Sequence, residues 1–394
     1  MVRQQHIVIV GAGIVGLSTA YALLTQGIRN VTILEQEVID HARSSSHGFS
    51  RLLRFEYGPD ALYSNMVRLS IKRWKNLEQV VGRTLFTPTG LLMLGNNDDR
   101  ITQSSYQIVR GLGVPAEQLS KEACGLRFPQ FNTQRYNLCI YNQEAGILHA
   151  STCLQSLRDL ILDLGGEIYE YSRVTRITKD SQLRPILLHL SSGHEITADQ
   201  VVLATGSWIH RLLAHLHLPV RMTRQYLLYF SGLPVSTYGT GAFPSFMAGD
   251  IYGFPIHQGC NGWVKATSHA FGTPTDPDHV THQDDLAIDT ISTQIRELLP
   301  ELKHAQIAHV DSCMYDVTPD EDFILDRLPS DPRVIFATGL SGHGFKFGLL
   351  LGELLSSLVC NTEPAVPLDR FRISRFAYRR TQEIERYLAS TSLV

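Results

Sequence analysis

The stretch that decides the fold is HIVIVGAGIVG, at residues 6–16. Residues 7–10 are apolar and β-branched, which is typical of a parallel strand buried on both faces. Residues 14–26 predict a helix, and Gly27 suits its C-terminal end. Residues 31–35, VTILE, then predict a second strand. Together these stretches predict one complete βαβ unit.

The three glycines of the turn have separate physical roles. Gly11 permits a tight turn, Gly13 lets the backbone approach a pyrophosphate, and Gly16 lets helix and strand pack closely. The helix N-terminus offers free N–H groups and a positive dipole end to phosphates. Glu35 ends the second strand, where a carboxylate can bind ribose hydroxyls. The motif therefore predicts a dinucleotide site, without separating FAD from NAD.

The rest of the chain predicts two interleaved domains. A chain of 394 residues exceeds the ~250–300 residues at which a single core usually stops growing. Buried strands are expected at 200–204 and 334–337, and both end in Ala-Thr-Gly. Such turns suit a cofactor lying across the carboxyl edge of the sheet. Between these signals lies material rich in aromatic residues, Gly and Pro, notably 85–94 and 221–311, which predicts strands and loops. Helices are expected at 60–81, at 150–164 and up to Val359.

Composition excludes several classes of partner and site. A net charge of −3 without long single-sign runs argues against nucleic acid or an anionic membrane. No secretory signal is visible, and residues 347–359 are too short and too polar to span a bilayer, so we expect a cytoplasmic protein without a membrane partner. No metal is expected, because the spacing of His210, His215 and His217 fits no single face of an element. The stretch 276–285, with His279 and His282, reads as a solvated loop.

A loop with small hydroxyl residues follows soon after Glu35. Residues 44–54 read SSSHGFSRLLR, and such small residues suit a loop that wraps an extended cofactor. Arg51 and Arg54 are three positions apart, so one helical turn would put them on one face. They would then clamp a carboxylate, or one would lie against the cofactor; the alternative is a solvated basic turn.

Several stretches, in order along the chain, resemble the monomeric sarcosine oxidase family. Besides the first motif and the 44–54 loop, they are GWVKATSHAFG at 262–272, CMYDVTPD at 313–320 and SGHGFKF at 341–347. The family comprises N-methyl amino acid oxidases within the D-amino acid oxidase-like FAD-dependent oxidoreductases. The resemblance spans almost the whole chain.

The resemblance implies an α/β (α+β) fold. A Rossmann-like FAD-binding domain, formed by residues 1–84, 150–215 and 314–394, is interleaved with a substrate domain. The substrate domain, formed by residues 85–149 and 216–313, has a mainly antiparallel sheet. A monomer is expected.

The resemblance also implies roles for individual residues. Cys313 would carry FAD through a thioether to the flavin 8α carbon, a plausible route because a thiolate is a strong nucleophile. The other five cysteines read as structural. The full set of expected cofactor contacts is Gly11, Gly13, Gly16, Glu35, Ser45, Ser46, Arg51, Gly206, Cys313, Gly342, Gly344 and Lys346.

The expected substrate contacts surround a carboxylate. Arg54 and Lys346 match the cations that hold it, and Tyr252, Tyr315 and His269 match residues around the pocket. Lys265 matches the lysine that activates oxygen, since a desolvated ammonium stabilises superoxide. The expected catalytic residues are Lys265, Arg51, His269 and Lys346.

The implied reaction oxidises a secondary amine, either a sarcosine-like N-methyl amino acid or a cyclic imino acid, to an imine, with O2 reduced to H2O2. Residues 55–59, FEYGP, depart from the family, because Pro59 stands where sarcosine enzymes carry a glutamate, and Ser50 replaces a threonine. Three alternatives stay open. The same fold could act on a bulkier or primary amine, pass electrons to another acceptor, or serve as a maturation partner. Lys265 argues against the second, and Arg54 with Lys346 against the third.

Overall fold

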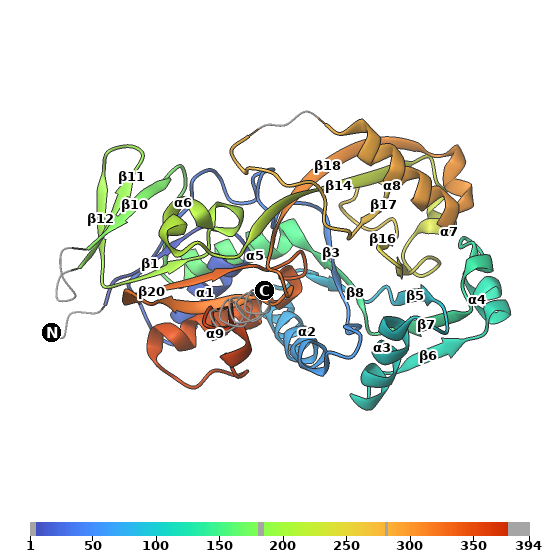
Figure 1. The fold of residues 1–394 in the computed structure, drawn as a ribbon, viewed down its shortest axis with the longest axis horizontal. Coiled ribbons are helices and arrows are strands. Elements are labelled where there is room, and N and C mark those ends of the chain that lie inside the picture. The colour runs from blue at the N-terminus through green and yellow to red at the C-terminus, as the bar shows by residue number, and fades with distance from the viewer. Residues whose placement is uncertain (1–4, 180–184, 280–282, 377–394) are drawn as a thin grey trace, which may run out of the picture.

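The chain folds around two large β-sheets with covering helices. The computed structural model describes residues 5–179, 185–279 and 283–376. The fold is mixed α/β, which confirms the predicted class. Figure 1 shows the parallel sheet, with β1 and β20, towards the left and the second sheet, with β14 and β17, towards the right.

The first sheet is built on the N-terminal βαβ unit. β1 (Ile7–Val10) lies between β13 (Gln200–Leu203) and β2 (Val31–Leu34), and all three run parallel. Every residue of β1 and β2 is buried, which explains their nearly continuous apolar sequence. The remaining strands are β9 (Glu167–Tyr169) beside β2, then β20 (Asp331–Thr338) beside β13, and the antiparallel β19 (Ile324–Leu328) at the edge.

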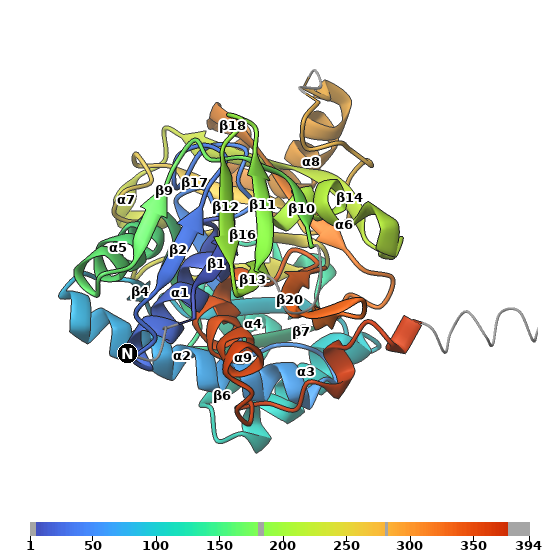
Figure 2. The same ribbon diagram turned by 90° about the vertical axis from the view of Figure 1, so that its left-hand side faces the viewer.

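Helix α1 (Ile14–Thr25) packs closely against α9 (Gly348–Cys360), as Figure 2 allows the reader to follow. The close approach depends on Gly352, where an added Cβ would come within 2.4 Å of the backbone carbonyl of Ser18. Helix α5 (Ala150–Asp163) also packs against α1. The first turn of α1 is thereby held firmly beneath the glycine motif.

Helix α2 (Ala61–Val81) packs against α9 and against the turn that precedes it. Its N-cap is Asp60, whose carboxylate accepts hydrogen bonds from the backbone N–H groups of Leu62 and Tyr63. Trp74 lies fully buried on its apolar face and donates through Nε1 to the carbonyl oxygen of Lys346, at 2.8 Å. The helix therefore helps to fix the turn that carries Lys346.

The second sheet is mainly antiparallel, as predicted. β14 (Arg221–Ser231) and β18 (Gln306–Val317) form a long ribbon at one edge, followed by β17 (Val264–Ser268) and β16 (Ile251–Phe254). Among the described strands of this sheet, only the pair β15–β5 is parallel. The sheet is completed, in spatial order, by β15 (Ser245–Ala248), β5 (Leu91–Gly95), β7 (Leu138–Asn142) and β6 (Ala116–Leu119).

Two small sheets lie beside the large ones. β8 (Gly146–His149) pairs with β3 (Ser50–Leu53) on one side and β4 (Phe86–Thr87) on the other. The second small sheet contains β10 (Val174–Thr178), β11 (Ile186–Leu190) and β12 (Glu195–Ala198). The other helices are α3 (Arg100–Gly111), α4 (Lys121–Arg127), α6 (Ile209–Leu213), α7 (Val235–Tyr238) and α8 (Asp285–Leu298).

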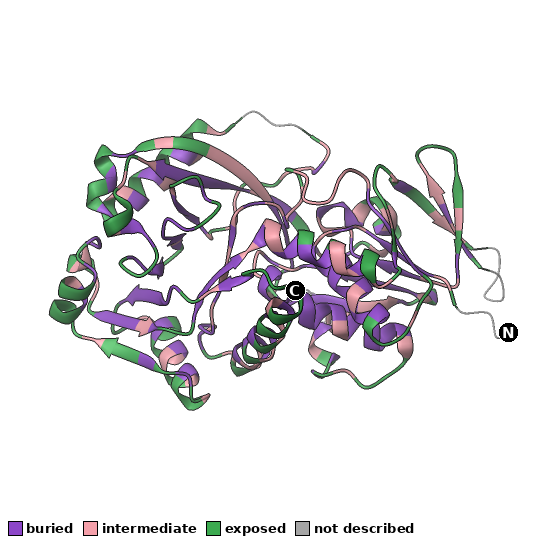
Figure 3. Ribbon diagram, turned by 180° about the vertical axis from the view of Figure 1, so that it is seen from behind, coloured by how far each residue is buried: buried purple, intermediate pink, exposed green. Residues whose placement is uncertain are grey.

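The expectation of only strands and loops in 221–311 is wrong at the short α7 and at the longer α8. Its four buried residues (Ile288, Ser292, Ile295, Leu298) follow the helical spacing of three to four positions, and Asp284 caps its N-terminus. The surrounding sequence is rich in aromatic residues and glycine, which favour strands and loops, so the overall composition of 221–311 did not indicate this helix. Figure 3 shows that buried residues concentrate in both large sheets and in the helices that cover them.

The division into two interleaved domains stays our proposal. β18 crosses the proposed boundary between residues 313 and 314, so that boundary falls inside one strand. The portions of the FAD-binding segments at 1–4, 180–184 and 377–394, as well as His282, lie outside the described residues. Within the described part of the chain, no helix has both the length and the apolar character that crossing a bilayer requires.

Candidate active site

One extended cavity runs between the two large sheets. It is lined by every site residue that the sequence predicts except Gly16. At one end lie Gly11, Gly13 and Glu35, and at the other lie Lys265 and Lys346. Residues from the start, middle and end of the chain therefore meet in a single site.

The glycine turn has the close contacts that its sequence predicts. Gly11 has a φ of +102°, and an added Cβ would lie 2.5 Å from the carbonyl oxygen of Ala204. At Gly16 an added Cβ would lie 1.9 Å from the Gly11 carbonyl oxygen. Gly16 therefore does not line the cavity but allows the glycine turn to pack directly against α1. Gly13 lines the cavity at the N-cap of α1, whose first N–H groups have no partner within the helix.

Glu35 and Ser46 accept hydrogen bonds from backbone N–H groups at the N-terminal end of α1. Oε2 of the buried Glu35 accepts from the Ala12 N–H at 2.8 Å, and Oε1 accepts from the Glu37 N–H at 3.0 Å. Burial raises the pKa of Glu35. Ser46 Oγ accepts from the Ile14 N–H at 3.0 Å. A glycine cradle, a helix N-terminus and a carboxylate in one cavity fit a dinucleotide with pyrophosphate and ribose groups.

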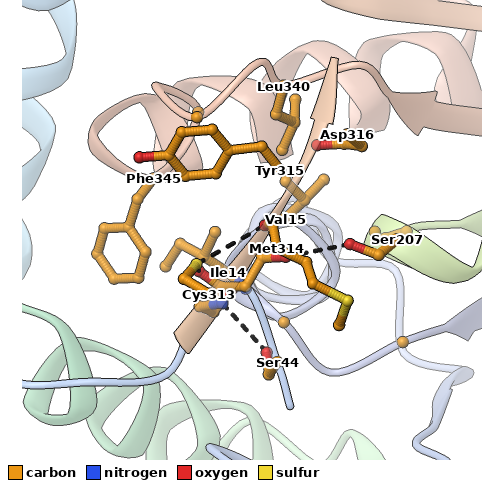
Figure 4. Close-up of a pocket in the computed structure, with 18 of the residues that line it drawn as sticks. Ile14, Val15, Ser44, Ser207, Cys313, Met314, Tyr315, Asp316, Leu340 and Phe345 are labelled. Atoms are coloured by element: carbon orange, nitrogen blue, oxygen red, sulfur yellow. Dashed lines mark hydrogen bonds between the residues drawn. The ribbon is translucent and has the colours of Figure 1, made fainter. Parts of the chain in front are cut away.

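Cys313 projects from β18 into the middle of the cavity, where Figure 4 shows it near Ile14 and Met314. Its Sγ lies 3.7 Å from the carbonyl oxygens of Ser45 and Met314. Burial raises the pKa of the Cys313 thiol, while the charges of Arg51 and Lys265 act in the opposite direction. Of the six cysteines, all of which the structure describes, only Cys313 lines this cavity.

Arg51 and Arg54 reach the cavity from an extended segment, so the predicted helical turn is wrong. Ser50–Leu53 forms β3 and pairs with β8, almost a hundred residues later in the chain. The Arg51 guanidinium donates to the carbonyl oxygens of Ser45, His47 and Ser50. Its Cζ lies 5.5 Å from the Phe345 ring centroid. Arg51 therefore ties the 44–50 loop around the middle of the cavity.

Arg54 and Lys346 are two neighbouring cations, and among the described residues no carboxylate lies within ion-pair distance of either, although the charge of Arg54 acts on the nearby buried Glu56. Among the described residues, Arg54 has no hydrogen bond or ion pair, and its Cζ lies 4.5 Å from the Tyr57 ring centroid. Lys346 is buried, and its Nζ donates to Tyr57 Oη at 2.8 Å and to the His343 carbonyl oxygen at 3.0 Å. Burial, and then Arg54, lowers the pKa of Lys346 well below its usual value. A bound anion would offset the burial cost of both charges and would favour the protonated form of Lys346.

Lys265 is the second buried lysine of the cavity. It is only 2% exposed, and its Nζ donates to the carbonyl oxygen of Ser50 at 3.0 Å. The Phe254 and Tyr229 ring centroids lie 5.2 Å and 5.9 Å from Nζ. Burial, and then the Arg51 charge, lowers the pKa of Lys265 to about 7. Its charge therefore changes close to neutral pH.

Aromatic side chains enclose the cavity beside the cation pair. His269 lies edge-on to Tyr252 and Tyr315, with ring centroids 6.0 Å and 5.7 Å away. Burial, and then Arg54 and Lys346, lowers the pKa of His269 to about 4, so this imidazole is neutral at pH 7. The backbone of Gly342 makes room for the Tyr315 ring, because an added Cβ would lie 2.4 Å from it. Gly344, Gly206 and Ser45 line the same cavity.

Several residues of the site are not identified by the sequence alone. Tyr57 and His343 stand in the stretches 55–59 and 341–347, but only the folded chain shows their contacts with Lys346 and with each other. Asp316, in the motif at 313–320, is buried and accepts from the Gly339 N–H at 2.7 Å, which holds the Ala-Thr-Gly turn. At the far end of the cavity, Trp208 and Arg211 contact Asp278. The last contact had no sequence signal, because its members lie far apart along the chain.

The stretch from 276 to 285 is therefore not simply a solvated loop. Arg211 donates to the Asp276 carboxylate at 2.6 Å, and Asp278 accepts from Trp208 Nε1 at 2.8 Å. Asp284 and Asp285 belong to the N-terminal end of α8. Long-range ion pairs hold the first part of this stretch against α6.

Known proteins resemble the chain over nearly its full length. Residues 6–358 match the family described as FAD dependent oxidoreductase. The peroxisomal sarcosine oxidase of Homo sapiens is 32% identical over 381 residues, covering 94% of this chain and 95% of that protein. The monomeric sarcosine oxidase of Bacillus sp. (strain B-0618) is 28% identical, covering 95% and 97%. The structure of L-proline dehydrogenase from P. horikoshii superposes with a TM-score of 0.82 at 20% identity, covering 96% and 99%, which shows the shared fold.

Proposed function

The chain belongs to the FAD dependent oxidoreductase family, and from this premise we propose that it oxidises a secondary amino acid, with dioxygen as the electron acceptor. The proposed substrate is a sarcosine-like N-methyl amino acid or a cyclic imino acid, the products are an imine and H2O2, and Cys313 holds FAD covalently. We also propose a monomer. The cytoplasmic location stays a prediction from the sequence.

The observation that carries the proposal is the unpaired cation pair. Among the described residues Arg54 has no carboxylate within ion-pair distance, Glu56 acting on it only from further away, and the two groups that accept from Lys346 Nζ are neutral. Buried charges without partners are costly, so a ligand that brings a carboxylate is strongly favoured there. Many amines lack a carboxylate, and amino acids have one next to the amine carbon. The pair thus selects amino acids among amines.

The neighbouring side chains suit the rest of such a substrate. Tyr252, Tyr315 and neutral His269 enclose the cavity beside Arg54 and Lys346, which excludes water and adds no charge against the amine. With the carboxylate fixed by two cations, the carbon next to nitrogen is held in one orientation. FAD, when bound, supplies the acceptor for two electrons and the route by which dioxygen receives them.

Lys265 and Cys313 have separate proposed tasks. Lys265, held by the Ser50 carbonyl oxygen, places an ammonium in a desolvated part of the cavity when it is protonated, and this charge would stabilise negative charge developing on dioxygen. Cys313 would join the flavin 8α carbon as a thioether; burial raises the pKa of its thiol, and the nearby charges of Arg51 and Lys265 partly offset that rise in favour of the thiolate.

Anaerobic flavin bleaching tests the substrate class. The panel pairs each secondary amino acid with the amine that lacks its carboxylate, such as pipecolate with piperidine and sarcosine with dimethylamine, and adds glycine as a primary amino acid. We expect bleaching by at least one secondary amino acid and none by its partner amine. Equal bleaching by both members of a pair would refute the role of the cations, and no bleaching at all would favour a maturation partner. Reoxidation in air with stoichiometric H2O2 is expected, whereas slow reoxidation would indicate another electron acceptor.

Acid precipitation tests the covalent link. We expect the yellow colour to stay with the precipitated protein, and to move into the supernatant for Cys313→Ser. Cys360→Ser is the matched control, since Cys360 is also half-buried but lies outside the cavity. Free flavin released from the unaltered protein would contradict the link while leaving the amine chemistry open.

A further inference from the structure

We propose that Tyr57 is a positioning residue that sets the spacing of Arg54 and Lys346, and that His343 fixes the Tyr57 hydroxyl for this purpose. The inference rests on the proposed function and deepens it. Tyr57 lies between the two cations: Arg54 Cζ is 4.5 Å from its ring centroid, and Lys346 Nζ is 2.8 Å from its Oη. One side chain thus contacts both groups that would bind the substrate carboxylate.

The Glu321 carbonyl oxygen fixes which atom donates in each hydrogen bond of this cluster, because a carbonyl oxygen can only accept. His343 Nε2 lies 3.1 Å from the carbonyl oxygen of Glu321, which only accepts, so Nε2 carries the proton. Burial lowers the pKa of His343 well below its usual value, so the ring is neutral and Nδ1 is an acceptor. Tyr57 Oη lies 3.2 Å from Nδ1 and must donate to it.

The Tyr57 hydroxyl can therefore only accept a hydrogen bond from Lys346. Because its proton points to His343, Tyr57 Oη accepts from Lys346 Nζ. A second N–H of Lys346 is taken by the His343 carbonyl oxygen. An ammonium has three N–H donors, so one remains for a ligand. His343 and Tyr57 together therefore determine which donor of Lys346 is available.

Tyr57 holds both cations without cancelling their charge. Its ring attracts Arg54 through the negative face of the π system, and its hydroxyl stays neutral because burial raises the pKa of Tyr57 above its usual value. A carboxylate in the same place would neutralise the cations and compete with the ligand. A neutral aromatic hydroxyl leaves both side chains available for a carboxylate, whose negative charge favours the protonated form of Lys346.

The surroundings keep the Tyr57 ring in place. It stacks on Tyr63 of α2, with ring centroids 5.1 Å apart and planes inclined by 20°. Tyr63 in turn packs edge-on against Phe323 and lies under Arg370, which bridges Asp60 and Asp322. The cation spacing is thus anchored to the first turn of α2.

Binding of acetate and acetamide to the flavin-loaded protein tests the inference. Both probes have the same shape, but only acetate is charged, and their Kd values follow from perturbation of the flavin absorption. We expect Tyr57→Phe, which keeps the ring, to weaken acetate binding roughly tenfold, in line with one lost hydrogen bond to a charged group. Acetamide binding should not change. Tyr57→Leu should weaken acetate binding further, because Arg54 loses the ring as well.

A double-mutant cycle separates this role from a general structural one. In a Lys346→Met background, Tyr57→Phe should change the acetate Kd by less than about twofold, because its hydroxyl acts through Lys346. His343→Gln keeps an acceptor and a donor and should rescue most of the affinity that His343→Leu loses. Tyr238→Phe is the matched control, since the buried Tyr238 donates to Glu301 outside the cavity.

The outcomes distinguish this inference from the proposed function. If the wild type binds acetate and is bleached by amino acids, but Tyr57→Phe binds acetate equally well, only the positioning role is wrong. Equal weakening of acetate and acetamide would also overturn it, because a distorted cavity explains that result. If the wild type neither binds acetate nor is bleached, both proposals fail.

Discussion

At the scale of single residues, the site gathers cationic side chains whose hydrogen-bond partners are neutral. Arg51, Arg54, Lys265 and Lys346 bring four cationic side chains into one cavity. Arg51 and Lys265 rest on backbone carbonyl oxygens, whereas Arg54 and Lys346 rest on Tyr57. Neutral partners leave net positive charge in the cavity, which suits a cofactor with a pyrophosphate and a substrate with a carboxylate.

Lys265 gives a pH-dependent prediction. Its pKa is lowered to about 7, so the ammonium is present below this pH and is lost above it. We expect the reoxidation of the reduced protein by dioxygen to slow as pH rises through about 7. Lys265→Met should be slower by roughly 10²–10³-fold at pH 6, the effect typical of removing one stabilising donor, and its rate should not respond to pH in this range. Stopped-flow measurement of flavin absorbance between pH 6 and 9 checks both expectations.

Acetate binding provides the control for Lys265. Its contact is the Ser50 carbonyl oxygen rather than Arg54 or Lys346, so the acetate Kd of Lys265→Met should stay close to that of the wild type. A reoxidation rate that stays constant for the wild type across the pH range would contradict the assigned role.

At the scale of elements, the N-terminal unit shows why local sequence predicted so much. In β1 and α1 the burial pattern, the turn and the helix stop all lie within about twenty residues, so the sequence contains the whole pattern. Arg51 and Arg54 show the limit. Their segment is a strand because it pairs with β8, and no local pattern identifies that partner.

Gly352 gives a prediction about packing between elements. An added Cβ would approach the backbone of Ser18 to 2.4 Å, so Gly352→Ala must push α9 away from α1 and should lower the free energy of unfolding by about 1–3 kcal/mol. Gly125→Ala is the matched control, since Gly125 in α4 has only one neighbouring atom within 4 Å, at 3.8 Å. That change should be neutral or stabilising, by up to about 1 kcal/mol. Thermal and urea unfolding of the two variants distinguish these cases, and equal effects would contradict the close helix contact.

At the scale of the whole molecule, the cavity exists because distant segments meet. The glycine turn, Glu35 and the motifs at 313–320 and 341–347 were predicted as site residues, since each stands in a recognisable stretch. The contacts that close the cavity were not predicted. Asp278 lies between β17 and β18 of the second sheet in the chain, whereas Arg173 directly precedes β10 and Arg211 lies in α6, which follows β13 of the first sheet. Only the folded chain brings such groups together.

Asp278 gives a prediction about how the two sheets are held. Its carboxylate accepts from Trp208 Nε1 at 2.8 Å and from Arg211 and Arg173 at 3.1 Å and 3.2 Å, at the end of the cavity next to Glu35. The ion pairs are partly exposed and therefore screened, so Asp278→Ala should lower the free energy of unfolding by only about 1 kcal/mol in low salt.

The same contacts make this stabilisation depend on pH. Although burial acts in the opposite direction, the Trp208 hydrogen bond and the Arg173 and Arg211 charges hold the pKa of Asp278 below its usual value. The stabilisation is therefore complete above about pH 4 and is lost as pH falls through the folded-state pKa. Unfolding measured at pH 7 with 50 mM and 1 M NaCl should show the difference shrinking at high salt, because screening already weakens the wild-type ion pairs. Asp289→Ala, at an exposed position of α8, should behave like the wild type. A loss for Asp278→Ala that is equally large in 1 M NaCl would mean that the Trp208 hydrogen bond, rather than the ion pairs, holds the two sheets together at this end of the cavity.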